Sequence, residues 1–261
     1  MTQPVLSVKD LKKSFGHNDV LKGINFDVYP GQIIGYIGPN GAGKSTTVKI
    51  FLGMLDKDHG DITMFGSPLN YGDWEYKHRI GYVPEQSEVY ENLTASEYLT
   101  FVGGMYGMED KEILSKASAL MDLFGIKDTL HSRISSYSKG MRQKLLIIAS
   151  MIHDPDILFL DEPLSGLDAN SVMVFKEILA QLKSRGKTIF YSSHIMEVVE
   201  KISDRILLLS GGEIVADGSF DELKAQSTEG SLQEIFNQLT GFNEHADIAS
   251  KFVEIMERRS S

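Results

Sequence analysis

The chain has no cysteine, and no apolar stretch in its 261 residues is long enough to cross a membrane. A membrane-spanning helix needs roughly 18 apolar residues, whereas the longest apolar run, around residues 145–152, is interrupted by Ala149 and Ser150. The first residues, MTQPVLSVKDLKK, lack the charged start and apolar centre of a signal peptide. A cytoplasmic protein is therefore expected, and the absence of cysteine adds weak support.

An excess of positive charge is also missing. The chain has 26 Lys and Arg against 36 Asp and Glu, which gives a formal net charge of −10. Proteins that bind nucleic acid tightly normally carry surplus Lys and Arg on one face, so nucleic acid is disfavoured as a partner. The length is near the upper limit for a single hydrophobic core, and one large domain with a subdomain is expected.

The most informative segment is GPNGAGKST, which follows a short apolar run and fits Gly-x-x-x-x-Gly-Lys-[Ser/Thr]. Its glycines allow backbone conformations that a Cβ forbids, so several N–H groups can converge on one anion. A helix beginning near Gly43 adds its positive end, Lys44 can reach the β- and γ-phosphates, and the Ser45 hydroxyl can ligate Mg²⁺. Chance would produce such a match in roughly one chain of this length in a hundred. The predicted phosphate-binding residues are Gly38, Pro39, Asn40, Gly41, Ala42, Gly43, Lys44, Ser45 and Thr46.

Strand and helix patterns alternate along most of the chain. This alternation predicts an α/β fold with a largely parallel sheet and a ligand at the carboxyl ends of its strands. At the start, weak alternation at residues 6–8, 20–21 and 24–28 predicts a small antiparallel sheet. Further strands are predicted at residues 32–37, 61–65, 79–83, 157–160, 188–192, 205–209 and 213–216, and helices at 45–54, 139–152 and around 175–182.

Residues 88–136 show helical spacings and no strand pattern, which predicts a helical insert. We expect the main domain to cover residues 1–220 and a helical C-terminal extension to cover 221–261. Two apolar stripes in the extension either pack on the domain or bind a partner, and packing is the commoner use of such helices. The stripes are Leu232, Ile235, Phe236 and Leu239, followed by Ile248, Phe252, Ile255 and Met256.

The segment DILFLDEP is an apolar run that ends in two carboxylates, Asp161 and Glu162. A carboxylate at the tip of a buried strand is costly unless it has a partner. Asp161 would find one by helping to hold Mg²⁺ opposite Ser45, and Glu162 would accept a proton from the attacking water or orient it. Alone, such a pair is more often a helix cap or an ion pair. Downstream of a phosphate loop, the catalytic interpretation is favoured.

The segment YSKGMRQK, from Tyr137 to Lys144, begins a helix whose free N–H groups form a second anion site. A kinase or a switch GTPase needs one such site. The second indicates either a larger ligand or a site shared between two protomers. The plain alternative is that Ser138 only caps its helix.

In the order GPNGAGKST, YSKGMRQK, DILFLDEP, SGLD and a histidine after a strand, the chain resembles the ABC family of nucleotide-binding domains over essentially its whole length. The resemblance implies a P-loop NTPase fold and a head-to-tail dimer, of two identical chains or of two different ones, that sandwiches ATP and Mg²⁺. Ser138 and Gly140 would then face the γ-phosphate bound by the partner. Lys139 and Met141 depart from the commonest signature, Leu-Ser-Gly-Gly-Gln. The Ser-Lys-Gly-Met form and SLQEIFNQLTG resemble the branch that exports drugs, peptides or lipids.

The same resemblance implies roles for single residues. Phe15 would stack on adenine, although an isolated Phe is more often a core residue. Asp168 would link the two sites of the dimer, or act only as a helix N-cap. His194 would donate to the γ-phosphate and hold the Glu162 region in register.

One position has two candidates. The family places a Gln after the strand that corresponds to residues 79–83, where it touches Mg²⁺ and the attacking water. Alignment on Asn92-Leu93-Thr94 places Glu85 at this position. The residue type instead favours Gln86, and Gln86 is taken as the metal contact.

The function expected from the resemblance is ATP hydrolysis that powers a separate multi-span permease, with the chain at the cytoplasmic side of the cell membrane. The aromatic residues Tyr90, Tyr98 and Phe101 either relay motion to that permease or form the core of the helical insert. The alternative function is a soluble ABC ATPase that remodels ribosomes or nucleic-acid complexes, which usually has two fused domains or a long coiled insertion. A P-loop GTPase is disfavoured because no Asn-Lys-x-Asp motif is present.

Overall fold

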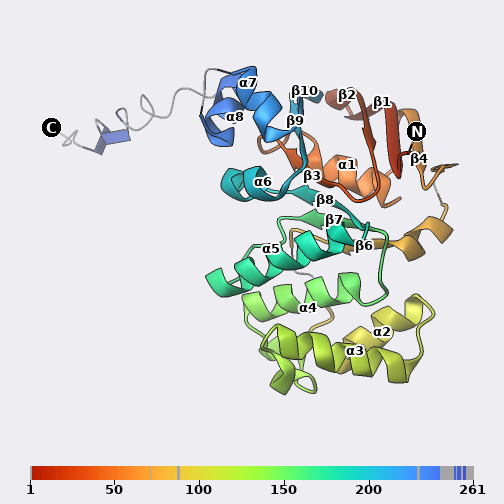
Figure 1. The fold of residues 1–261 in the computed structure, drawn as a ribbon. Helices are drawn as coiled ribbons and strands as arrows, with labels where there is room; N and C mark the ends of the chain where they lie inside the picture. Colours follow the sequence, from red (N-terminus) through yellow and green to blue (C-terminus); the bar gives the residue numbers. More distant parts are fainter. Residues whose placement is uncertain are drawn as a thin grey trace.

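Two β-sheets and a set of helices make up the computed structural model, which describes residues 2–70, 72–86, 89–227, 230–241, 250, 252–253 and 255–256 (Figure 1). The larger sheet has six strands in the order β10-β9-β3-β8-β7-β6. Its strands are β3 (Ile33–Ile37), β6 (Ile80–Val83), β7 (Ile157–Asp161), β8 (Thr188–Ser192), β9 (Arg205–Ser210) and β10 (Glu213–Gly218). All neighbours pair in parallel except β10, which runs antiparallel to β9. The predicted, mostly parallel core sheet is confirmed.

The smaller sheet is antiparallel, with the order β2-β1-β4-β5. It consists of β1 (Leu6–Phe15), β2 (Asn18–Val28), β4 (His59–Met64) and β5 (Ser67–Pro68). Its first two strands are longer than the sequence indicates. Register shifts interrupt the pairing of β1 with β2, and Asp10 has a positive φ of 47°. Such bulges break the period-two alternation that reveals a strand in a sequence.

The α1 helix (Lys44–Phe51) packs between the two sheets. Val48 and Phe51 on this helix join a buried cluster that contains Leu6 of β1 and both Tyr36 of β3 and Phe190 of β8. The phosphate loop leads directly into α1. Packing of α1 in this cluster therefore also fixes the position of the loop.

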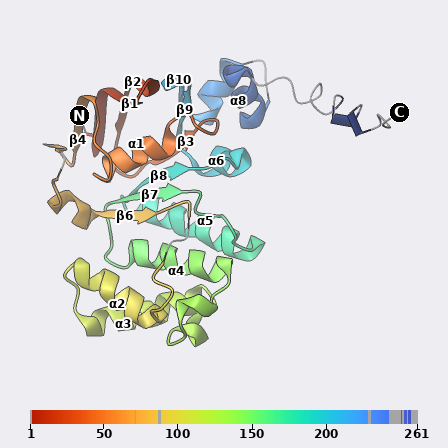
Figure 2. The same cartoon turned by 180° about the vertical axis from the view of Figure 1, so that it is seen from behind.

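The other helices lie on the opposite side of the large sheet, where their buried residues join one hydrophobic cluster with it. They are α2 (Ala95–Met105), α3 (Asp110–Leu123), α4 (Lys139–Met151), α5 (Ala169–Ser184), α6 (Met196–Ile202), α7 (Phe220–Ala225) and α8 (Leu232–Thr240), with 3-10 turns at Glu75–Arg79, Lys127–Thr129 and Ile134–Ser136. Both ribbon views show α2 and α3 stacked on α4, away from the sheet (Figures 1 and 2). Among the described residues, none of the helices combines the length and the apolar character needed to cross a bilayer.

The predicted helical insert contains α2 and α3, and residue 88, its expected start, lies outside the described residues. The first apolar stripe of the C-terminal extension packs on the domain. Leu232 and Ile235 are buried, and Glu200 of α6 accepts a hydrogen bond from the Leu232 N–H. Of the second stripe, Phe252, Ile255 and Met256 are exposed, whereas Ile248 lies outside the described residues.

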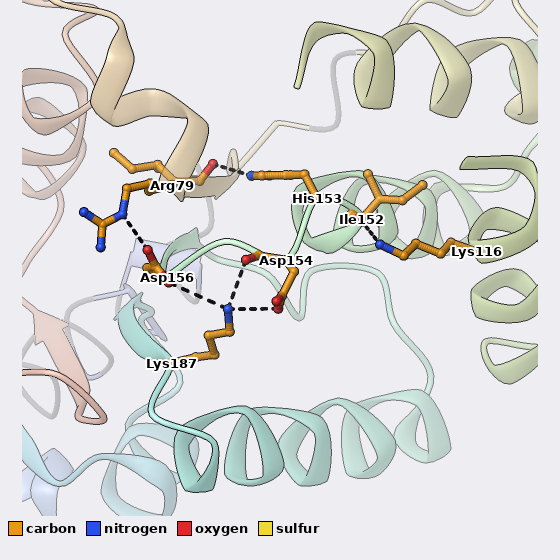
Figure 3. A network of polar contacts seen from close by, with 8 residues as sticks. Arg79, Lys116, Ile152, His153, Asp154, Asp156 and Lys187 are labelled. Atoms are coloured by element: carbon orange, nitrogen blue, oxygen red, sulfur yellow. Dashed lines mark hydrogen bonds and ion pairs between the residues drawn. The ribbon is translucent and has the colours of Figure 1, made fainter. Parts of the chain in front are cut away.

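A network of polar contacts lies at the end of the sheet where β6, β7 and β8 begin (Figure 3). Arg79 Nε donates to Asp156 Oδ2 at 2.6 Å, and Lys187 Nζ lies 2.9 Å from Asp154 Oδ1 and 3.8 Å from Asp156 Oδ1. The Nε2 atom of His153, just after α4, lies 2.9 Å from the carbonyl oxygen of the first residue of β6. These contacts fix the connection from α4 to β7 at the amino ends of the strands, and the opposite edge carries the candidate site.

A glycine in β6 permits the close approach of α4 to the sheet. A Cβ added at Gly81 would lie 2.2 Å from the Ser150 carbonyl oxygen. We expect Gly81→Ala to lower the free energy of unfolding by about 1–3 kcal/mol, because the overpacked helix must shift. Gly104→Ala is the control: its Cβ would meet nothing within 4 Å on α2, and we expect it to raise stability by about 0.5–1 kcal/mol. Urea unfolding measures both, and equal effects would contradict this packing.

Candidate nucleotide site

A cavity of about 770 Å³ lies at the carboxyl ends of the parallel strands. Its size falls within the range of small-molecule sites. It is lined by Asn18, Val20, Asn40, Gly41, Gly43, Lys44, Ser45, Thr46, Glu85, Asp161, Glu162 and His194. The structure therefore brings together most of the phosphate loop and the predicted acidic and imidazole side chains. In the sequence, the phosphate loop lies more than a hundred residues before Asp161, Glu162 and His194.

The phosphate loop is already curved around its lysine. Lys44 Nζ donates to the carbonyl oxygens of Gly38 at 2.7 Å and Pro39 at 3.3 Å. A Cβ on Gly38 would lie 2.2 Å from the Leu209 carbonyl oxygen, and Gly43 has a φ of 110° before α1. Burial lowers the pKa of Lys44, and the nearby carboxylates oppose this shift. A cationic amine and the start of a helix thus face the same cavity.

Ser45 and Asp161 provide two oxygen atoms next to each other. The Ser45 hydroxyl donates to Asp161 Oδ2 at 3.1 Å, and Asp161 is 5% exposed at the end of β7. Burial raises the pKa of Asp161, and the nearby side chains of Ser192 and Ser45 act in the opposite direction. Within the described ranges, no group of three or more His, Cys, Asp and Glu side chains is arranged to hold a metal. Mg²⁺ commonly takes one or two protein oxygens and the rest from phosphate and water, so this pair fits Mg²⁺ bound together with a nucleotide.

Glu162 and His194 are in direct contact. Glu162 Oε1 accepts a hydrogen bond from the His194 backbone N–H at 2.7 Å and lies 2.8 Å from His194 Nδ1. Its other oxygen, Oε2, accepts from the Ser193 hydroxyl at 3.0 Å. The side chain of His194 is 74% exposed and can reach a ligand. Ser193 is missing from the site residues predicted from the sequence, because a serine before a histidine is not a distinctive pattern.

The bend after β6 presents Glu85 to the cavity. Both Glu85 and Gln86 are exposed, and Glu85 is the one that lines the cavity wall. Its charge also acts on Asp161 and Lys44. Gln86, the choice from residue type, is not part of this lining, whereas the alignment-based choice, Glu85, is, and a metal contact by either residue stays a prediction.

Phe15 is not a core residue. It ends β1 with 50% of its surface exposed, and Lys13 Nζ lies 5.5 Å from the centre of its ring. The neighbouring strand β2 contributes Asn18 and Val20 to the cavity. Phe15 is thus available at the surface near the cavity, and stacking on adenine stays a prediction.

The second anion site is not part of this cavity in a single chain: among the described residues, neither Ser138 nor Asp168 belongs to its lining. Ser138 is exposed and caps α4, accepting from the Met141 N–H at 3.3 Å. Asp168 caps α5 and accepts from the backbone N–H of Ser171 at 2.9 Å and from its hydroxyl at 2.5 Å. The hydrogen bonds from Ser171, and then the nearby Lys144, hold the pKa of Asp168 well below its usual range. Both helix-capping interpretations are therefore realised.

Comparison with known proteins agrees with this arrangement. Residues 21–165 match the family model described as ABC transporter. An uncharacterized ABC transporter ATP-binding protein of Nostoc sp. is 41% identical over 231 residues, which cover 85% of this chain and 68% of that protein. The linearmycin resistance ATP-binding protein LnrL of Bacillus subtilis is 36% identical, with 84% of this chain and 70% of LnrL covered. A solved structure of the ATP-binding subunit of an ABC transporter matches with a TM-score of 0.85 at 33% identity, over 90% of this chain and 99% of that one.

Proposed function

Because the chain belongs to the ABC transporter family, whose ATP-binding domains hydrolyse ATP, we propose that it powers a separate membrane permease for export as half of a head-to-tail dimer. One observation carries this proposal. The phosphate loop, Asp161 and Glu162 share one cavity, while the exposed helix start at Ser138 lies outside it. The cavity of each chain thus lacks the helix start at Ser138. The exposed helix start of a second chain could fill this place.

Within the cavity each residue has a distinct task. The phosphate-loop N–H groups and Lys44 bind the phosphates, with the Lys44 amine leaving its own loop carbonyls to do so. Ser45, Asp161 and Glu85 would hold Mg²⁺, which would supply positive charge to the phosphates of a bound nucleotide. Glu162 takes the proton of the attacking water or orients it, and its contact with the His194 backbone fixes its direction.

The partner chain completes the charge stabilisation that one cavity lacks. The helix start at Ser138 and Gly140 would donate N–H groups to the γ-phosphate bound by the other chain. Those contacts disappear once the γ-phosphate is released, so the dimer closes with ATP and reopens after hydrolysis. Asp168 sits next to this helix, paired to Lys144 at 3.4 Å, and would link the two sites.

The aromatic residues of the helical insert divide into two kinds. Tyr98 is buried and belongs to the core, whereas Tyr90 and Phe101 are 62% and 49% exposed. Their rings meet edge to face with centroids 5.9 Å apart. They line a second cavity of about 460 Å³ together with Val89, Glu91, Asn92 and Leu93. This exposed apolar surface supports contact with a permease, which would hold the chain at the cytoplasmic side of the membrane.

Export of a drug, peptide or lipid-like cargo is the proposed direction. It is supported by the Ser-Lys-Gly-Met signature and by the similarity to LnrL, a linearmycin resistance protein. The alternative of a soluble remodelling ATPase has no feature in its favour: the net charge is −10, and the chain shows one phosphate loop.

Complementation between two inactive variants tests the shared site. We expect Lys44→Ala and Ser138→Arg each to abolish ATP turnover, because the first damages the loop and the second blocks the helix start. In a head-to-tail pair that contains one chain of each, one of the two sites receives an intact loop and an intact helix start. Co-expressed chains should therefore regain up to about a quarter of wild-type turnover, since about half of the dimers are mixed.

Phosphate release by the purified, co-expressed variants is the measurement. Ser115→Arg is the control for Ser138→Arg, because Ser115 is an exposed residue on α3. It should keep full turnover alone. Co-expressed variants that stay inactive while the control is active would contradict a site shared between copies of this chain.

A further inference from the structure

The first turns of α4 are joined to the loop that follows Glu162. A Cβ on Gly140 would lie 2.6 Å from the Gly166 carbonyl oxygen, so the helix can approach this loop only with glycine at that position. One turn further, Lys144 Nζ lies 3.4 Å from Asp168 Oδ2. These contacts lie on one helix face and cover residues 163–168, which we call the post-Glu162 loop.

Gln143 is the buried member of this face. Its side chain is 0% exposed, and its Nε2 donates to the Pro163 carbonyl oxygen at 3.0 Å. A buried amide of this kind is costly unless its polar atoms have partners. The residue after Glu162 thus receives a hydrogen bond from the helix that carries Ser138.

The backbone of Glu162 needs such support. Its φ of 48° lies in the left-handed region, which a residue with a Cβ adopts only where its surroundings hold it there. On one side, the Glu162 N–H donates to the Ser192 carbonyl oxygen at 2.9 Å, which anchors it to β8. On the other side, the next residue is held by Gln143. Two elements therefore fix this turn from opposite ends.

We infer that Gln143 is a positioning residue for Glu162 and connects it to the helix start at Ser138. The inference rests on the role proposed for Glu162 above.

Gln143→Leu tests it, because leucine keeps a similar volume and removes the donor. We expect kcat to fall about 10- to 100-fold, as misplacement of a catalytic group by a distant change does. The affinity for ATP should change less than about two-fold, since the phosphate loop on α1 keeps its contacts. Gln181→Leu is the control, because Gln181 is exposed on α5 and its amide nitrogen donates to the neighbouring side chain of Glu177. It should change neither quantity.

A double-mutant cycle separates positioning from general damage. If Gln143 acts through Glu162, then Gln143→Leu should lower the residual turnover of Glu162→Gln by less than about two-fold, because the group that it positions is already gone. Equal fold losses in both backgrounds would overturn the inference, as would unchanged kcat in Gln143→Leu alone. Full turnover in Glu162→Gln alone would instead contradict the proposed function. If Gln143→Leu does not fold, Gln143→Met replaces it in the cycle, with the same expected results.

Discussion

Glu162→Gln is expected to lower the ATP turnover number by about 10²- to 10⁴-fold, which is the usual contribution of a general base. The amide has nearly the same shape as the carboxylate: its oxygen can still accept the hydrogen bond from the His194 backbone N–H, and its NH2 can donate to the Ser193 hydroxyl oxygen. It cannot take a proton from water at neutral pH. ATP binding should therefore survive, because the phosphate loop and Asp161 are unchanged.

Phosphate release gives the turnover number, and equilibrium binding of a fluorescent ATP analogue gives the affinity. Glu177→Gln is the matched control, since Glu177 is an exposed carboxylate on α5, and it should behave like the natural chain. A turnover number within a factor of about three of the natural one, less than 1 kcal/mol of barrier, would remove Glu162 from the base role.

Lys44→Ala is expected to weaken ATP binding by at least about 100-fold, because removing one partner of a charged hydrogen-bonded pair costs several kcal/mol. Lys44→Ala thus weakens the binding of ATP itself, whereas Glu162→Gln slows the reaction of bound ATP. In the structure Lys44 Nζ bonds the Gly38 and Pro39 carbonyl oxygens. The variant therefore also loses the contact that curves the loop before a nucleotide arrives.

Isothermal calorimetry with Mg²⁺ and ATP measures this loss. Lys49→Ala changes the same residue type on the same helix at an exposed position, and it should bind ATP like the natural chain. Similar losses in both variants would show that the helix, and not the amine of Lys44, is responsible. A normal affinity in Lys44→Ala would contradict the assignment of this cavity to the nucleotide.

Buried strands and capped helices could be predicted well from the sequence. The strand Thr188–Ser192 has the predicted bounds, because a strand buried on both faces is a continuous apolar run between polar residues. The helix after Ser138 begins where expected, because that serine caps it. The α6 helix was missed: its seven residues are too few for an apolar period to stand out.

The parts of the site that were missed depend on contacts between distant segments. Ser193 and Gln143 have ordinary sequence surroundings, and their roles follow from bonds to Glu162 and Pro163 that only the folded chain creates. The choice between Glu85 and Gln86 is of the same kind, because it depends on which side chain of a short bend faces the cavity. Motif spacing in the sequence predicts the type of chemistry, whereas the roles of these residues can be assigned only from the folded structure.

The alignment of the central strands has a consequence for how activity is lost. Asp161 is paired opposite Ser192 at the last step of the β7–β8 ladder, and β8 in turn aligns with β3, from which the phosphate loop leaves. A slip of one residue anywhere along this ladder would turn Asp161 to the wrong face and separate it from Ser45. A molecule with slipped strands would therefore have no ATPase activity, so misalignment would lower the specific activity of a preparation in proportion to the fraction of slipped molecules.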